Sequence, residues 1–99
     1  MPRVLFTISY AIKPEVRTEY LTFAKTMQNY FTDVVKKEYT VYEVKGKKNH
    51  FVEVFLSRSL EDFDALEDNQ DEKTQELVSR LHEFIDDEGM KYQTLVELD

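Results

Sequence analysis

The chain has no cysteine, no tryptophan, and only two glycines and two prolines among its 99 residues. Without cysteine it has neither a disulfide framework nor a thiolate that could bind a metal or act as a nucleophile. Because 41% of the residues are hydrophobic while glycine and proline are scarce, a collagen-like, low-complexity or disordered chain is excluded. We expect a single globular domain over residues 1–99, and a cytoplasmic location is the default for such a chain.

Long apolar runs and a surplus of basic charge are also missing. The apolar stretch near the start is interrupted by polar residues and is too short for a signal peptide or a membrane span. Aspartate and glutamate number 20 against 13 lysines and arginines, which gives a formal net charge of -7. Since contacts with nucleic-acid phosphates require a basic face, we expect no nucleic-acid partner, and we expect no membrane association.

The hydrophobic periodicity predicts four strands and two helical regions. Alternation with a period of two predicts strands over residues 3–12, 38–45, 50–59 and 91–98. Apolar residues at three- and four-residue spacing predict a helix from Pro14 to Val34 and a second helical region that begins at Ser59 with a capping box. The polar segment 67–72 predicts a break in this second region, which then resumes and ends at residues 86–89.

The order β-α-β-β-α-β is that of the ferredoxin-like α+β fold, a four-stranded antiparallel sheet with both helices on one face and the first and third strands in the middle. On the third strand Phe51, Glu53 and Phe55 point to one face, and Val52 and Val54 point to the other. Which face the helices cover stays open. Because the helices cover one face only, we expect a homodimer that packs through the other sheet face.

Residues 51–55, Phe-Val-Glu-Val-Phe, followed by a helix from Ser59, resemble the dimeric α/β-barrel superfamily, in particular its antibiotic biosynthesis monooxygenase-like group. Members typically carry Glu-x-Trp on the third strand and an early histidine on the next helix. Glu53 matches the glutamate, and Phe55 takes the place of the tryptophan. Residues 63–66, where the histidine is expected, are Phe, Asp, Ala and Leu, so the chain departs from the group at both positions.

The resemblance implies a ferredoxin-like domain that forms a dimeric α/β barrel. If the protein is an enzyme, the resemblance implies cofactor-independent oxygen chemistry on a quinol-type substrate that supplies the electrons. Because the tryptophan and the histidine are missing, the chain lacks the residues that would favour haem degradation or quinol oxygenation, and we expect no cofactor.

Glu53 is the sharpest catalytic candidate. A carboxylate on a central strand between two phenylalanines is difficult to solvate, and burial would raise its pKa, as suits an acid or base in a pocket. The alternative is a structural hydrogen bond or ion pair with Arg58, Arg3 or a tyrosine at the dimer interface.

Other candidates are weaker. His82 lies beside an apolar stripe and is a candidate general base or haem-proximal ligand, or else a partly exposed or core-edge histidine. Ser9, Tyr42 and Phe55 are candidates for contact with a planar ligand. Three tyrosines on three predicted strands, Tyr10, Tyr42 and Tyr92, would either gather around such a ligand or belong to the core or interface.

No metal site is expected, because the two histidines are far apart in the predicted fold and the acidic series 61–72 lacks the oxygen spacing and glycine of a calcium loop. The main functional hypothesis is a module that binds a small planar, apolar molecule between sheet and helices. The alternatives are the quinol oxygenase and a non-enzymatic structural or protein-interaction module whose acidic second helix meets a basic surface. The residues leave open whether the protein is an enzyme.

Overall fold

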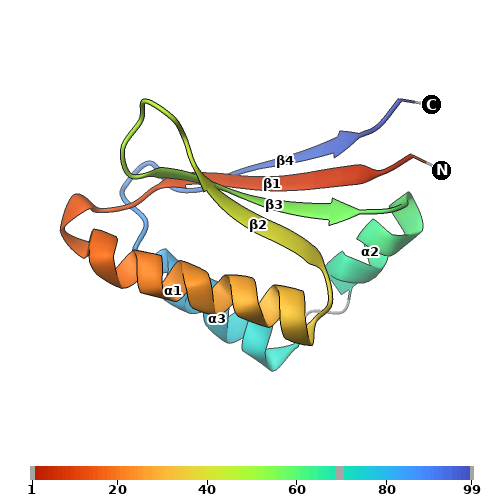
Figure 1. Cartoon of the computed structure of the whole chain (residues 1–99), viewed down its shortest axis with the longest axis horizontal. Helices are drawn as coiled ribbons and strands as arrows, with labels where there is room; N and C mark the ends of the chain where they lie inside the picture. Colours follow the sequence, from red (N-terminus) through yellow and green to blue (C-terminus); the bar gives the residue numbers. More distant parts are fainter. Residues whose placement is uncertain (1, 69–70, 99) are drawn as a thin grey trace.

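The structure, a computed structural model, describes residues 2–68 and 71–98. Its four antiparallel strands form one sheet, and the helices lie on one side of that sheet (Figure 1). The strands are β1 (Val4–Ala11), β2 (Glu38–Glu43), β3 (His50–Ser57) and β4 (Lys91–Val96), in the spatial order β2-β3-β1-β4. The ferredoxin-like α+β fold is therefore confirmed, with β1 and β3 in the centre.

The first helical region is not one regular helix. It consists of a 3-10 turn η1 (Pro14–Val16), the helix α1 (Arg17–Asn29) and a π-helical turn η2 (Tyr30–Val34). Proline suits the first turn because its missing amide hydrogen would have no partner there. The wide final turn ends where Val35 N–H donates to the Tyr30 carbonyl at 3.0 Å.

The second helical region consists of two helices, α2 (Leu60–Asp68) and α3 (Glu72–His82). Ser59 caps the first of these helices as predicted, since its hydroxyl accepts from the Asp62 N–H at 3.1 Å. The second bond of a capping box is shifted by one residue, because the Asp62 carboxylate accepts from the Arg58 N–H at 3.3 Å. The expected break over 67–72 falls between the two helices, and residues 69–70 lie outside the described residues. The helix ends at His82, earlier than predicted, because Ile85 forms an isolated bridge with Ile12.

The strand register shows which face of the sheet the helices cover. Tyr10 lies opposite Phe51, and Ile8 lies opposite Glu53, so these side chains share one face. Phe51 and Glu53 are buried there, within the core beneath α1 and α3, whereas Val54 on the opposite face is half-buried (Figure 1). The face with Glu53 is therefore the helix-covered one.

Candidate functional site

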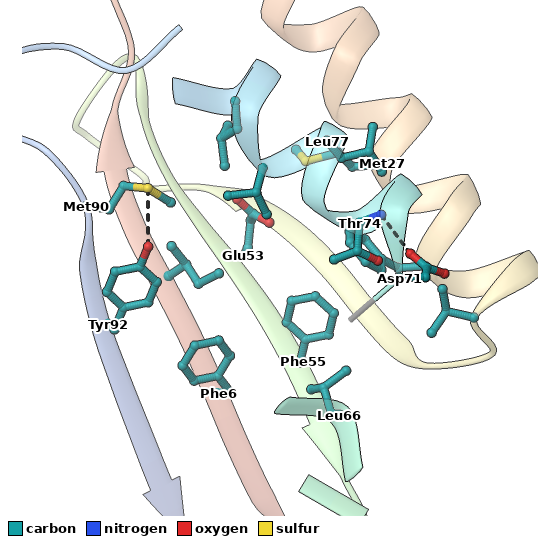
Figure 2. Close-up of a pocket in the computed structure, with 15 residues that line it drawn as sticks. Phe6, Met27, Glu53, Phe55, Leu66, Asp71, Thr74, Leu77, Met90 and Tyr92 are labelled. Carbon is teal, nitrogen blue, oxygen red and sulfur yellow. Dashed lines mark hydrogen bonds between the residues drawn. The ribbon is translucent and has the colours of Figure 1, made fainter. Parts of the chain in front are cut away.

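A cavity of about 330 Å³ lies between the sheet and the helices (Figure 2). This is at the lower end of the size range of small-molecule sites, roughly 300–1,000 Å³. Its apolar lining consists of Phe6, Ile8, Met27, Phe31, Val35, Phe55, Leu66, Leu77, Val78, Leu81 and Met90. Its lining residues with polar side-chain atoms are Glu53, Asp71, Thr74 and Tyr92.

Aromatic rings form a continuous series along the cavity wall, from η2 to the sheet. The ring centres of Phe31 and Phe55 are 5.2 Å apart, and those of Phe55 and Phe6 are 6.3 Å apart. Tyr92 stacks on Phe6 with a centre-to-centre distance of 6.1 Å. Because β1, β3, β4 and η2 each supply one ring, the cavity depends on the assembled sheet and not on one local segment.

Glu53 is the charged group at the centre of this site. Its side chain projects from β3 toward α3 (Figure 2), and the residue is only 2% exposed. Oε1 accepts a hydrogen bond of 2.6 Å from the Tyr39 hydroxyl. Oε2 is buried and has no hydrogen-bond partner within the part of the chain that the structure describes. One oxygen of the carboxyl group is therefore held by the protein, and the other is left for a group inside the cavity.

Burial raises the pKa of the Glu53 carboxyl, and the hydrogen bond from the Tyr39 hydroxyl partly opposes the rise. Burial and the nearby carboxyl also raise the pKa of Tyr39 and of Tyr10, whose hydroxyl lies 2.6 Å from that of Tyr20. These phenols therefore keep their protons, so Glu53 is the group in the cavity that is suited to take up or release one.

Asp71 marks the polar edge of the cavity, at the start of α3. Its carboxylate caps the helix by accepting from the Thr74 N–H at 2.7 Å, and it also accepts from the Tyr30 hydroxyl. These hydrogen bonds lower the pKa of Asp71. A permanently ionised carboxylate therefore lies at the edge, while Glu53, whose pKa is raised, lies inside.

The structure brings together some of the sequence candidates and separates others. Glu53 and Phe55 both line the cavity. Ser9 and Tyr42 lie on the other sheet face, outside it, since Ser9 pairs with Val52 and Tyr42 is 56% exposed. His82 is exposed at the end of α3 and does not line the cavity. Among these candidates, only Glu53 and Phe55 share a site.

Of the two alternatives for Tyr10, Tyr42 and Tyr92, a cluster around one ligand does not form. Tyr10 is buried against Tyr20, Tyr42 is on the open face, and Tyr92 lines the cavity alone of the three. Strand alternation separates them, because Tyr10 and Tyr42 occupy opposite faces of the sheet.

The partner of Glu53 is a tyrosine, Tyr39, as one alternative held. Neither arginine pairs with it: Arg58 bonds Glu38 at 3.0 Å, and Arg3 bonds Glu97 at 2.7 Å. The predicted position of Glu53 at a dimer interface on the open sheet face is wrong, because Glu53 lies on the face that the helices cover.

Several residues of the site carry no signal that sequence reasoning could use. Met27 and Leu77 occur in helical stripes that indicate only a core, and Thr74 occurs as an ordinary polar residue of an exposed helix face. Phe31 belongs to the apolar stripe of the first helical region, and it also lines the cavity.

Within residues 2–68 and 71–98, no three or more His, Asp or Glu side chains gather as metal ligands would. No described helix is long and apolar enough to cross a membrane.

The comparisons with known proteins establish the fold. Neither a protein-family model nor a curated protein sequence matches the chain. Among solved structures, a proposed antibiotic biosynthesis monooxygenase from Deinococcus radiodurans matches with a TM-score of 0.78 at 11% identity, covering 97% of this chain and 93% of that one. A cofactor-independent oxygenase from Streptomyces nogalater matches with a TM-score of 0.73 at 11% identity, covering 94% and 90%.

Rv0793 from Mycobacterium tuberculosis matches with a TM-score of 0.76 at 15% identity, over 98% of this chain and 96% of that one. The resemblance to antibiotic biosynthesis monooxygenase-like proteins is thus confirmed as a likeness of fold, over nearly the whole chain. A shared fold does not carry an activity with it, so the function has to be argued from the cavity.

Proposed function

We propose that the protein binds a small, largely apolar molecule in the cavity between the sheet and α3, with Glu53 as the anchor for its polar group. The observation that carries the proposal is the free Oε2 of Glu53, a buried acceptor in an apolar, aromatic-lined space. A buried polar atom without a partner is costly, about 1–3 kcal/mol, and a bound group that hydrogen-bonds to it removes that cost.

The cavity also favours this function over a module that acts through protein contacts alone. Such a module needs only an exposed surface, whereas here a space of about 330 Å³ reaches from the exposed Tyr92 and Val78 at its edge to the buried carboxyl group of Glu53. Apolar pockets with a few convergent polar groups are the usual form of small-molecule sites.

An NMR titration with 1-naphthol tests the proposal, since this probe combines an apolar body with one hydroxyl donor. Saturable amide shifts are expected around Phe6, Glu53 and Phe55. Val78→Trp places a bulky ring at the cavity wall and should weaken binding about ten-fold or more, as expected when apolar contacts and the Glu53 hydrogen bond are lost. Leu21→Trp is the matched control, because Leu21 is 45% exposed on α1 and does not line this cavity.

Shifts that do not saturate, or that Val78→Trp and Leu21→Trp affect equally, would contradict the proposed site.

A second candidate function is a cofactor-independent monooxygenation of a quinol-type substrate. It is supported by the position of Glu53, which could remove a hydroxyl proton inside a water-poor cavity, and by the fold shared with the oxygenase from Streptomyces nogalater. With 1,4-dihydroxynaphthalene and O2 the products would be 2-hydroxy-1,4-naphthoquinone and water. The substrate supplies all four electrons, one oxygen atom enters the ring and the other leaves as water.

Isotope labelling separates this reaction from uncatalysed oxidation. Under ¹⁸O₂ the enzymatic product carries one ¹⁸O atom in the ring hydroxyl, whereas simple oxidation to 1,4-naphthoquinone incorporates none. Glu53→Gln should lower the rate of labelled product by about 10²- to 10⁴-fold, the usual contribution of a general base. Equal rates with and without the protein would exclude the oxygenase function and leave ligand binding untouched.

A further inference from the structure

The charges around the cavity are all of one sign. Two carboxyl groups, Glu53 inside and Asp71 at the edge, line it, and among its described lining residues there is no lysine, arginine or histidine. The chain as a whole has a formal net charge of -7. A negative field of this kind repels anionic ligands and raises the local concentration of cations.

The uncharged part of the wall suits a cation as well. Phe6, Phe31, Phe55 and Tyr92 present aromatic rings to the same space as Glu53, and the sulfur atoms of two methionines add polarisable surface. Aromatic faces attract ammonium groups through the ring quadrupole, most strongly where water is excluded. A carboxylate surrounded by such rings is a chemical complement to an amine on an apolar body.

We infer that the ligand of this cavity is a small organic cation, a protonated amine on an aromatic or apolar body, whose ammonium group donates to Glu53 Oε2. The inference rests on the proposed function and names the ligand class for the same site. Oε1 is already held by Tyr39, so one carboxylate oxygen receives one ammonium hydrogen bond, and the aromatic rings surround the remainder of the charged group.

Three probes of nearly the same size and shape distinguish the possible ligand charges. They are 2-phenylethylammonium, the neutral 2-phenylethanol, and the anion 3-phenylpropionate, each titrated by calorimetry at pH 7 and low salt. A charge-assisted hydrogen bond is stronger than a neutral one, so the ammonium should bind about ten-fold or more tightly than the alcohol. The anion should bind most weakly, because the Asp71 carboxylate repels it and because it has no proton to donate to Glu53 Oε2.

Two variants locate the effect. Glu53→Gln retains the shape and removes the charge, so the ammonium should lose about ten-fold in affinity while the alcohol changes by less than about three-fold. Asp71→Asn preserves the helix cap and should lower the affinity for the ammonium by about two- to five-fold, and this loss should depend on the salt concentration. Glu76→Gln, an exposed carboxylate of α3 outside this cavity, is the control and should change neither affinity.

Circular dichroism and urea unfolding check that each variant is folded. If Glu53→Gln does not fold, the binding affinities of Asp71→Asn still decide the test. The inference is supported if the ammonium binds more tightly than the alcohol and if both cavity variants weaken its binding. An alcohol that binds as tightly as the ammonium, or an ammonium unaffected by the cavity variants, overturns the inference and leaves the proposed binding site standing. If none of the three probes binds, and 1-naphthol does not bind either, the proposed function fails together with the inference.

Discussion

The two carboxyl oxygens of Glu53 have different surroundings. Tyr39 holds Oε1 at 2.6 Å, and Oε2 has no partner among the described residues. Because burial raises its pKa, the folded protein binds the Glu53 proton more tightly than the unfolded chain does. The group that makes the cavity chemically useful therefore makes the fold sensitive to pH.

The sign of this sensitivity gives the first prediction. Below the ordinary pKa of glutamate, 4.5, Glu53 is protonated in both the folded and the unfolded state, and its full contribution to stability is present. As the pH rises above 4.5, the unfolded chain releases this proton while the folded protein retains it, so the free energy of unfolding falls by at most about 1.4 kcal/mol per pH unit until the raised pKa of the folded state is passed. Urea unfolding between pH 5 and 8 should show this decrease in the natural protein and not in Glu53→Gln.

Glu43→Gln is the control for that experiment. Glu43 is exposed and bonds Arg17, which lowers its pKa to about 2, so its contribution is lost as the pH falls from 4.5 toward 2. The Glu43→Gln substitution should therefore leave the pH dependence of the free energy of unfolding between pH 5 and 8 unchanged. A natural protein whose stability is flat across this range would contradict a raised pKa at Glu53.

At the residue level, the sequence was enough to predict that Glu53 is buried, but not which face of the sheet carries it or what surrounds it. Strand alternation between two phenylalanines predicts burial, because period-two residues share a face. The bond to Tyr39 depends on the register between β2 and β3, in which Val41 lies opposite Glu53 and Tyr39 lies opposite Phe55. A hairpin loop with Gly46 and Asn49 at positive φ sets that register, and alternation alone does not specify it.

At the level of elements, the cavity edge depends on how α3 is joined to η2. Asp71 receives the Thr74 N–H of its own helix and the Tyr30 hydroxyl of η2. This carboxylate thus ties together two helices that are about forty residues apart in sequence. The start of α3 should open more readily when Asp71 is replaced.

Asp71→Ala removes the cap and the contact with Tyr30 together, and we expect a loss of about 1–2 kcal/mol in the free energy of unfolding. Hydrogen exchange should accelerate first in the amides at the start of α3. Asp64→Ala, which removes an exposed carboxylate from α2, should cost much less. If the two variants lost equal stability, Asp71 would not be the connection proposed.

The sequence predicts the presence of the helices and strands better than it predicts the residues at which they end. Periodicity predicts both helical regions and all four strands, from β3, in which every second residue is buried, to β4, in which all residues are exposed. It does not predict that the last turn of the first helical region is π-helical, nor that Ile85 leaves the helix to meet Ile12. These ends are set by contacts between distant segments, which a local pattern does not contain.

On the scale of the whole molecule, the open sheet face is the largest feature that the fold leaves without cover. Leu5, Tyr42 and Leu95 on this face are 37%, 56% and 42% exposed, and half-buried Val54 lies on central β3. Helices cover the opposite face (Figure 1). A symmetric homodimer that packs sheet to sheet would bury these side chains, because a two-fold axis brings the same face of each copy together.

Val54→Lys tests this assembly. In a two-fold dimer it places two like charges near the centre of a desolvated interface, so association should weaken by at least about a hundred-fold. Light scattering after size exclusion at micromolar concentration should then give the mass of one chain for the variant and of two chains for the natural protein. Leu21→Lys, at an exposed position of α1 on the helical side, should stay dimeric. A natural protein with the mass of one chain would show that the open face meets solvent, and the cavity would then be complete within a single copy.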